Sequence, residues 1–188
     1  MISAIEAVKA INDVRHGQVV VATMTANRYW ETVSDNKDLD LPIFGAMGKA
    51  SSVALGLALS QPQKQIIVLD GDGSLLMNLG SLVTIAGMEP ANFVHFVFED
   101  GAYWTTGGQP IPGNGKFNLS AMAQDAGYKN SYEFDDLETL VSELPDVLNE
   151  NGPIFVSVKV THPDYSGEPF IGSTKNAMEK LSKVISGS

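Results

Sequence analysis

The residue best placed to do chemistry is Asp72, a carboxylate inside a glycine turn. It stands between Gly71 and Gly73, after an apolar run and before a segment with helical character. A glycine turn that joins a buried strand to the start of a helix presents free backbone N–H groups to a phosphate. A carboxylate repels a phosphate unless a cation lies between them, and a hard divalent ion such as Mg²⁺ takes oxygen ligands from both. The turn therefore predicts a phosphate site bridged by a divalent cation.

A second oxygen ligand is expected at the end of the neighbouring strand. Two familiar phosphate motifs do not fit the turn, because G-x-G-x-x-G would need glycine at Leu76 and no Gly-Lys-Ser/Thr sequence is present. Asp100 follows the next apolar run, 93–98, and is followed by Ala102 with its backbone carbonyl. Parallel strands joined by one helix end at the same edge of a sheet. We therefore expect Asp72, Asp100 and a carbonyl near Ala102 to share one cation with phosphate oxygens.

The elements that must position these residues alternate along the chain. An uninterrupted apolar run indicates a buried strand over 66–69, and mainly apolar segments indicate further strands over 19–22, 93–98 and 154–160, with a short one over 132–134. Helical spacing predicts helices over 3–15, 48–60, 74–87, 119–126 and 174–186, and a further helix after residue 135 that kinks or breaks at Pro145. This alternation predicts an α/β fold, a doubly wound parallel sheet with helices on both faces. In such folds ligands bind at the carboxyl ends of the strands.

Local signals refine this outline. Ser3 with Glu6, and Asp135 with Glu138, have the spacing of capping boxes. Residues 24–41 are mixed and polar, and no element is assigned to them. Residues 100–117 carry five Gly and two Pro in a long loop, and loops of that length are usually functional or disordered.

Composition narrows the class of protein. The chain has 188 residues, of which 44% are hydrophobic, and a net charge of −10. An acidic surface argues against a nucleic-acid or membrane-surface role. The absence of cysteine excludes disulfides, Cys-ligated zinc, iron–sulfur clusters and a thiol nucleophile. We expect a single cytoplasmic domain over 1–188, in which 161–188 form a C-terminal tail with a helix.

Four stretches of the chain together carry a resemblance to a known family. Gly71-Asp72-Gly73, followed after about 27 positions by a residue similar to Asn, resembles the motif of thiamine diphosphate (ThDP)-dependent enzymes. The segment 45–48 (GAMG) resembles their G-x-M-G segment. Residues 71–80 (GDGSLLMNLG) and 103–109 (YWTTGGQ) are similar to sulfopyruvate and phosphonopyruvate decarboxylases in particular. The resemblance runs from about Val19 to Val160 and implies the diphosphate-binding domain of the ThDP-binding fold.

The resemblance also implies roles for individual residues. It implies three Mg²⁺ ligands, the last through its backbone carbonyl: Asp72, Asp100 and Ala102. It implies cofactor contacts from residues in or near the matched segments: Gly45, Met47, Gly71, Gly73, Ser74, Asn27 and Tyr103. Among these, Met47 would wedge between the two cofactor rings, and the Gly45 carbonyl would accept a hydrogen bond from the pyrimidine amino group. Family members usually carry Asn at the Asp100 position, so we expect the extra charge to tighten metal binding and weaken cofactor binding.

The resemblance implies that part of the site lies on another chain. In this family a glutamate of a separate pyrimidine-binding domain activates the cofactor, and nothing in this sequence is similar to that domain. The implied protein is a lyase, the diphosphate- and Mg²⁺-binding subunit of a ThDP-dependent 2-oxo acid decarboxylase that works in a hetero-oligomer. A sulfonate or phosphonate substrate calls for Arg or Lys. Arg28, Lys116 or the partner could provide it, or the substrate lacks the second anion.

Other interpretations of the same residues remain open at this stage. An acetolactate-synthase-like carboligase subunit uses the same half-site, and a non-catalytic regulatory subunit could retain the fold. Asp72 could be a turn residue, Asp100 an ordinary strand-end carboxylate and Met47 part of the core. His95 is expected to be a core histidine, and neither His16 nor His162 is given a role. Two threonines and a glutamine of the long loop face the cofactor or only form a turn: Thr105, Thr106 and Gln109.

Overall fold

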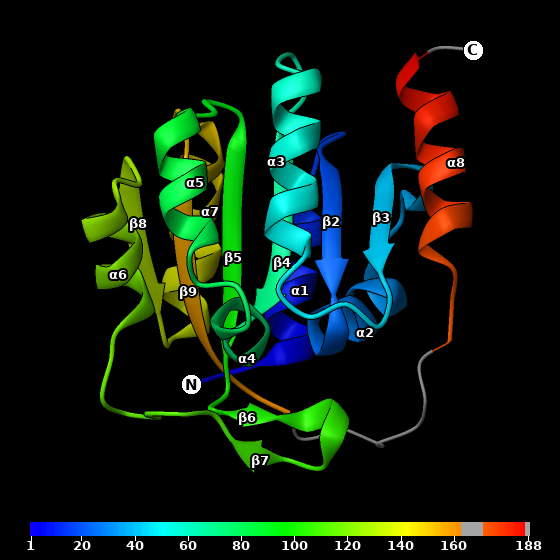
Figure 1. The fold of residues 1–188 in the computed structure, drawn as a ribbon. Helices are drawn as coiled ribbons and strands as arrows, with labels where there is room; N and C mark the ends of the chain where they lie inside the picture. The colour runs from blue at the N-terminus through cyan, green and yellow to red at the C-terminus, as the bar shows by residue number, and fades with distance from the viewer. Residues whose placement is uncertain (163–170, 187–188) are drawn as a thin grey trace.

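A parallel β-sheet forms the centre of the chain and has helices on both faces (Figure 1). The computed structural model describes residues 1–162 and 171–186. The strands of this sheet are β1 (Ile2–Ser3), β2 (Val19–Thr23), β3 (Asp40–Ile43), β4 (Ile66–Gly71), β5 (Phe93–Glu99), β8 (Asn130–Phe134) and β9 (Ile154–Thr161). Their order is β1-β9-β5-β4-β2-β3, and β8 also pairs with β9. Every pair in this sheet is parallel, so the predicted fold class is confirmed.

The helices divide into two layers. They are α1 (Ala4–Asp13), α2 (Met24–Val33), α3 (Ala50–Ser60), α4 (Asp72–Leu76), α5 (Ser81–Met88), α6 (Leu119–Ala126), α7 (Leu137–Asn149) and α8 (Thr174–Ser186). Buried side chains of α1, α2 and α7 form one core cluster with one face of the sheet. Those of α3, α5, α6 and α8 form a second cluster with the opposite face. Among the described helices, none has the length and apolar character needed to cross a membrane.

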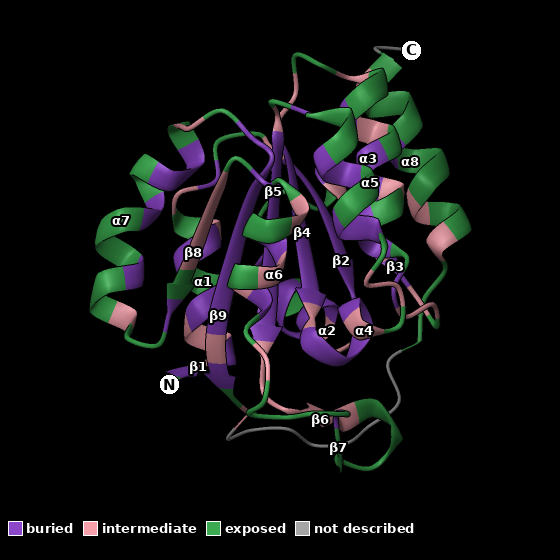
Figure 2. Cartoon of the chain, turned by 60° about the vertical axis from the view of Figure 1, so that its left-hand side comes forward, coloured by how far each residue is buried: buried purple, intermediate pink, exposed green. Residues whose placement is uncertain are grey.

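The central strands are buried on both faces, which explains their uninterrupted apolar sequences. In β4, Ile66 and Val68 belong to the cluster under α3, whereas Ile67 and Leu69 belong to the cluster under α1 and α2. Successive side chains of a strand point to opposite faces, so a strand covered on both sides needs apolar residues at every position. Figure 2 shows this buried centre and the exposed outer faces of α7 and α8.

The long loop after β5 contains a small hairpin. It is formed by β6 (Ala102–Tyr103), the 3₁₀ helix η2 (Trp104–Thr106) and β7 (Gln109–Pro110), which pairs antiparallel with β6. The hairpin lies beyond the carboxyl ends of the parallel strands (Figure 1). The predicted loop is therefore an ordered cover over that edge.

Some predicted elements differ from the structure. The unassigned polar stretch 24–41 contains helix α2, a 3₁₀ turn η1 (Lys37–Leu39) and the start of β3. The expected helix over 74–87 is wrong as a single element, because α4 ends at Leu76 and α5 begins at Ser81. The break lies at Asn78, whose side-chain amide donates to the Gly48 carbonyl at 2.8 Å.

The expected caps, and the expected break at Pro145, are also corrected. The Ser3 side chain makes no capping hydrogen bond on α1. In α7 the capping residue is Asp136, whose carboxylate accepts from the Thr139 backbone N–H at 2.9 Å, and not Asp135. The helix also continues through Pro145. The carbonyl that loses its bond there belongs to Val141, which is exposed, so water can replace the missing donor.

Candidate functional site

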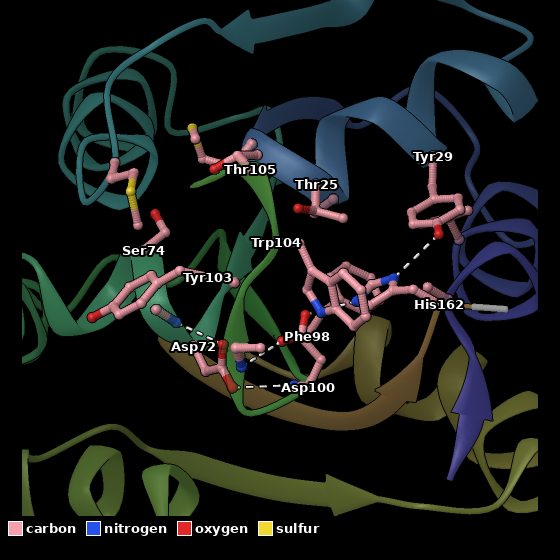
Figure 3. Close-up of a pocket in the computed structure, with 18 residues that line it drawn as sticks. Thr25, Tyr29, Asp72, Ser74, Phe98, Asp100, Tyr103, Trp104, Thr105 and His162 are labelled. Carbon is pink, nitrogen blue, oxygen red and sulfur yellow. Dashed lines mark hydrogen bonds and ion pairs between the residues drawn. The ribbon is translucent and has the colours of Figure 1, made fainter. Parts of the chain in front are cut away.

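The predicted ligands meet at the carboxyl ends of two adjacent strands. β4 and β5 pair in parallel with Gly71 opposite Phe98, so the residues that follow each strand lie at one edge. Asp72 opens α4 directly after β4, and Asp100 follows β5. Both line one cavity, together with Ala102 (Figure 3). The structure therefore brings the turns after β4 and β5 together, as expected.

Asp72 is buried and held by backbone donors. Its Oδ1 accepts from the Gly73 N–H at 2.6 Å, and its Oδ2 accepts from the N–H groups of Asp100 at 3.1 Å and Gly101 at 2.8 Å. Burial, and secondly the charge of Asp100, raise the pKa of Asp72 to about 6, although the three N–H groups act to lower it. Because the charge of Asp100 opposes ionisation of Asp72, a cation placed between the two carboxylates would stabilise the site.

Asp100 is also fixed at both oxygens. Its Oδ1 accepts from the Ala102 N–H at 2.8 Å, and its Oδ2 lies 2.6 Å from Nε2 of His162. Each Asp100 oxygen, and Oδ1 of Asp72, accepts one of these hydrogen bonds and keeps a second acceptor site. Hard oxygens of this kind are suited to Mg²⁺.

Two carboxylates alone do not complete a metal shell. Within the described ranges, no group of three or more acidic or histidine side chains is arranged to hold a metal ion. A cation between Asp72 and Asp100 would therefore need a backbone carbonyl and oxygens of a bound anion as well, which is how Mg²⁺ is commonly held beside phosphates. The donor set fits a metal–diphosphate group better than a bare metal ion.

The glycine turn is closely packed against the hairpin. A Cβ added at Gly73 would lie 2.6 Å from Cε1 of Tyr103, so the tyrosine ring rests directly on the turn. The Ser74 hydroxyl accepts from the Gly48 N–H at 2.9 Å and can still donate to an anion. Gly71, Gly73, Ser74 and Tyr103 all line the cavity.

The G-x-M-G segment borders the same cavity only in part. Met47 lines it, whereas Gly45 is outside its lining and has a φ of +65° that favours glycine. Gly48 also has a positive φ of +70°, and a Cβ there would lie 2.9 Å from Cβ of Asn78. The segment is thus fixed beside α4.

Asn27 is not brought to the other predicted residues. Its side chain is buried, but it lines a separate cavity with Trp30 and Lys180 between α2 and α8. Thr105 lines the cavity that Asp72 and Asp100 border. Thr106 and Gln109 hydrogen-bond to each other at 2.9 Å and shape the hairpin turn.

His162 and Met24 are cavity residues that the sequence did not identify. His162 follows β9, which pairs with β5, so its place after a buried strand was the available signal. Met24 starts α2 with φ at +51°, a backbone conformation that costs a non-glycine residue about 1–3 kcal/mol and is concentrated at functional sites.

The cavity is small with the hairpin in this position. Its volume is about 40 Å³, which is room for a few water molecules. Asp72 and Asp100 also border a second cavity of about 250 Å³ on the other side of the loop, lined by Gly101, Asn114 and Lys159 among others. The hairpin starts at Gly101, whose φ of +77° marks a turn that glycine makes easily.

Comparison with known proteins agrees with this geometry. Residues 18–158 match the family described as thiamine pyrophosphate enzyme, C-terminal TPP binding domain. The chain is 34% identical to sulfopyruvate decarboxylase subunit beta of Methanothermobacter thermautotrophicus, over all of this chain and 97% of that one. It is 37% identical to phosphonopyruvate decarboxylase of Streptomyces viridochromogenes over 78% of this chain, but it spans only 36% of that protein. Benzoylformate decarboxylase from Polynucleobacter necessarius has the same fold, with a TM-score of 0.69 and 18% identity over 84% of this chain and 32% of that one.

Proposed function

Because this chain belongs to the thiamine pyrophosphate enzymes, as their C-terminal TPP-binding domain, we propose that it is the ThDP- and Mg²⁺-binding subunit of a 2-oxo acid decarboxylase. The observation that carries the proposal is the pair Asp72 and Asp100, fixed side by side at the edge where β4 and β5 end. The likeness to a sulfopyruvate decarboxylase subunit along nearly the whole of both chains supports the reaction class.

The residues of the cavity divide into a metal part and a diphosphate part. Asp72, Asp100 and the Ala102 carbonyl would hold Mg²⁺. The turn at Gly73, with the Ser74 hydroxyl, would bind the diphosphate, although the Gly73 N–H itself donates to Oδ1 of Asp72. Bound there, ThDP would supply the electron sink that decarboxylation of a 2-oxo acid requires. The chain's own contribution is to hold and orient the cofactor and to cover it from water.

Further cofactor contacts come from residues around the turn. Met47 would support the two rings, Gly45 would offer its carbonyl to the pyrimidine amino group, and Tyr103 would close over the diphosphate. Gly71 would let the backbone approach the phosphate closely. Asn27 would join them only through a rearrangement of α2, because its side chain faces another cavity.

A separate subunit would supply the rest of the active site. The description of the Methanothermobacter relative as a subunit beta supports the existence of a partner subunit. We propose that this partner is a pyrimidine-binding chain with an activating glutamate, and that the two chains form a hetero-oligomer. The small acidic substrate would then lie between unlike chains. Because the chain spans about a third of the phosphonopyruvate decarboxylases, those proteins also have room for a further domain.

The test uses the complex purified with the partner that this chain recovers from its native lysate. Sulfopyruvate and phosphonopyruvate are supplied with ThDP and Mg²⁺, and carbon dioxide and the organic product are measured. We expect an aldehyde from one of them. A hydroxyketone would indicate a carboligase instead. No turnover, combined with no ThDP binding, would indicate a non-catalytic subunit.

The control for this test is a matched pair of variants. Asp72→Ala removes a proposed metal ligand, whereas Asp125→Ala removes an exposed carboxylate on α6, away from the cavity. The proposal requires product formation to be lost in the first variant and retained in the second. Equal activity in both would contradict the assignment of the site.

A further inference from the structure

His162 makes a hydrogen bond with each of its ring nitrogens at the edge of the cavity. Nε2 lies 2.6 Å from Oδ2 of Asp100, and Nδ1 lies 3.2 Å from the Tyr29 hydroxyl. The His162 side chain is only 2% exposed. An ionised carboxylate can only accept, so Nε2 is the donating nitrogen, and the tyrosine hydroxyl can donate to Nδ1.

The orientation of the imidazole ring is fixed by aromatic contacts as well. Its ring lies nearly parallel to that of Tyr29, with centroids 5.4 Å apart and an interplanar angle of 11°. Trp104 of the hairpin meets it edge to face at 5.2 Å and 71° (Figure 3). Helix α2, the hairpin and the end of β9 therefore all hold one ring, which leaves Nε2 a single direction in which to donate.

The hydrogen bond from His162 completes the fixation of Asp100. The Ala102 N–H binds Oδ1 and His162 binds Oδ2, so rotation of the carboxylate would break at least one of these bonds. The neighbouring Asp72 carries the same charge, so without these donors Asp100 would be repelled from the position that a shared cation requires.

We propose that His162 is a positioning residue that orients the Asp100 carboxylate toward a cation shared with Asp72. The proposal rests on the proposed function, since it assigns a role within the same metal site. In this role the imidazole neither binds the metal nor reacts. It holds the oxygen of Asp100 that it contacts, and each oxygen of the carboxylate keeps a second acceptor site.

The experiment measures Mg²⁺ affinity in the complex with its partner subunit at saturating ThDP, by calorimetry, and repeats it with Mn²⁺ by electron paramagnetic resonance. His162→Phe keeps a ring against Tyr29 and Trp104 but removes the donor. His162→Gln keeps a donor but removes the ring. His16→Gln is the matched control, because His16 is exposed in the turn that leads into the amino end of β2.

The expected result separates hydrogen bonding from packing. Loss of the donor in His162→Phe should weaken Mg²⁺ binding about 10- to 100-fold, the usual effect of removing a partner of a metal ligand. Saturating Mg²⁺ should restore ThDP binding and kcat, because the metal ligands themselves are intact. His162→Gln should remain within about threefold of the native affinity, and His16→Gln should be unchanged.

The other outcomes overturn either the positioning role of His162 alone or the proposed function as well. If the native complex binds ThDP with Mg²⁺ but His162→Phe has the native Mg²⁺ affinity, the positioning role is wrong while the proposed function stands. If His162→Gln is as weak as His162→Phe, packing and not donation is what matters, and the role is again wrong. If the native complex shows no Mg²⁺-dependent ThDP binding, both proposals fail.

A second variant keeps the test decisive should His162→Phe not fold. Tyr29→Phe removes only the hydroxyl that contacts Nδ1 and keeps the stacked ring. A loss of Mg²⁺ affinity of about two- to fivefold, reversed at saturating Mg²⁺, supports the chain of contacts from α2 through His162 to Asp100. An unchanged affinity in this variant contradicts it.

Discussion

Two Asp–His pairs lie in the part of the chain that the structure describes, and their difference shows where function resides in the sheet. Asp70 and His95 lie inside β4 and β5, with both side chains fully buried and 3.6 Å between His95 Nε2 and Asp70 Oδ2. Asp100 and His162 lie just past the ends of β5 and β9 and line the cavity. The same residue types therefore belong to the core in one place and to the cavity at the carboxyl ends of the strands in the other.

The inner pair is held by the groups around it, because the two facing atoms, His95 Nε2 and Asp70 Oδ2, are too far apart for a hydrogen bond. His95 Nδ1 lies 3.3 Å from the Tyr128 hydroxyl, and Phe155 meets the imidazole edge to face. Burial, and secondly the charge of Asp70, raise the pKa of Tyr128 above its usual range. Asp70 Oδ1 accepts from the Gly71 N–H, so this pair supports the start of the turn without reaching the cavity. The expectation that His95 is a core histidine is confirmed.

The largest effect is expected at Asp72, the neighbour of the Asp100–His162 pair in the cavity. Asp72→Ala removes a proposed metal ligand that lines the cavity, and we expect the affinity of the complex for ThDP with Mg²⁺ to fall about 1,000-fold, which is about 4 kcal/mol. Calorimetric titration of the complex measures this loss. A change of less than tenfold would mean that the cation lies elsewhere.

The inner pair should show the opposite pattern. His95→Ala empties space beside Phe155 and leaves the Tyr128 hydroxyl unpaired, so the free energy of unfolding should fall by about 3 kcal/mol. Urea unfolding measures the fall, and the folded fraction should retain native Mg²⁺ affinity. A large loss of affinity with unchanged stability would place His95 in the site and contradict the division between the two pairs.

A smaller effect is expected where the hairpin rests on the turn. Gly73→Ala would bring a Cβ to 2.6 Å from the Tyr103 ring, so the tyrosine has to move away from the 71–74 turn. We expect ThDP binding to weaken about tenfold with little change in unfolding free energy, because Tyr103 is only partly buried. Gly80→Ala is the control, since a Cβ there meets nothing within 4 Å.

The smallest effect concerns pH. The pKa of Asp72 is raised from 3.8 to about 6 in the fold, so the folded chain takes up this proton at a higher pH than the unfolded chain does. Stability without metal should therefore rise, by about 1 kcal/mol, as pH falls from 7 to 5. Urea unfolding of native protein and Asp72→Ala at both pH values isolates this contribution as the difference between their pH dependences. The stabilisation at low pH should disappear when Mg²⁺ and ThDP are bound. If the native protein instead lost stability relative to Asp72→Ala as the pH fell, the prediction would be contradicted.

The parts of the site that the sequence predicts are those fixed by neighbouring parallel strands. Asp72 and Asp100 could be placed together because each follows a mainly apolar segment, and consecutive strands of this kind tend to pair. Helix α6 could be placed to the residue, because Asn118 caps it with a bond to the Ala121 N–H at 2.7 Å.

The parts that could not be predicted depend on contacts between distant segments. His162 is 62 positions from Asp100 in the sequence, and only the pairing of β9 with β5 brings them together. Helix α2 was missed because its buried face includes polar Asn27 beside Trp30, which weakens the apolar pattern. The break between α4 and α5 follows from the Asn78 contact with Gly48, which no local preference shows.

The most direct measurement is the position of the metal itself. Crystals of the complex grown with ThDP and Mn²⁺ in place of Mg²⁺ would locate the metal by its anomalous scattering. We expect one peak between the carboxylates of Asp72 and Asp100, about 2 Å from an oxygen of each, and next to the diphosphate. A peak away from Asp72, or ThDP bound with its diphosphate elsewhere than on the 71–74 turn, would contradict the assignment of this edge as the cofactor site.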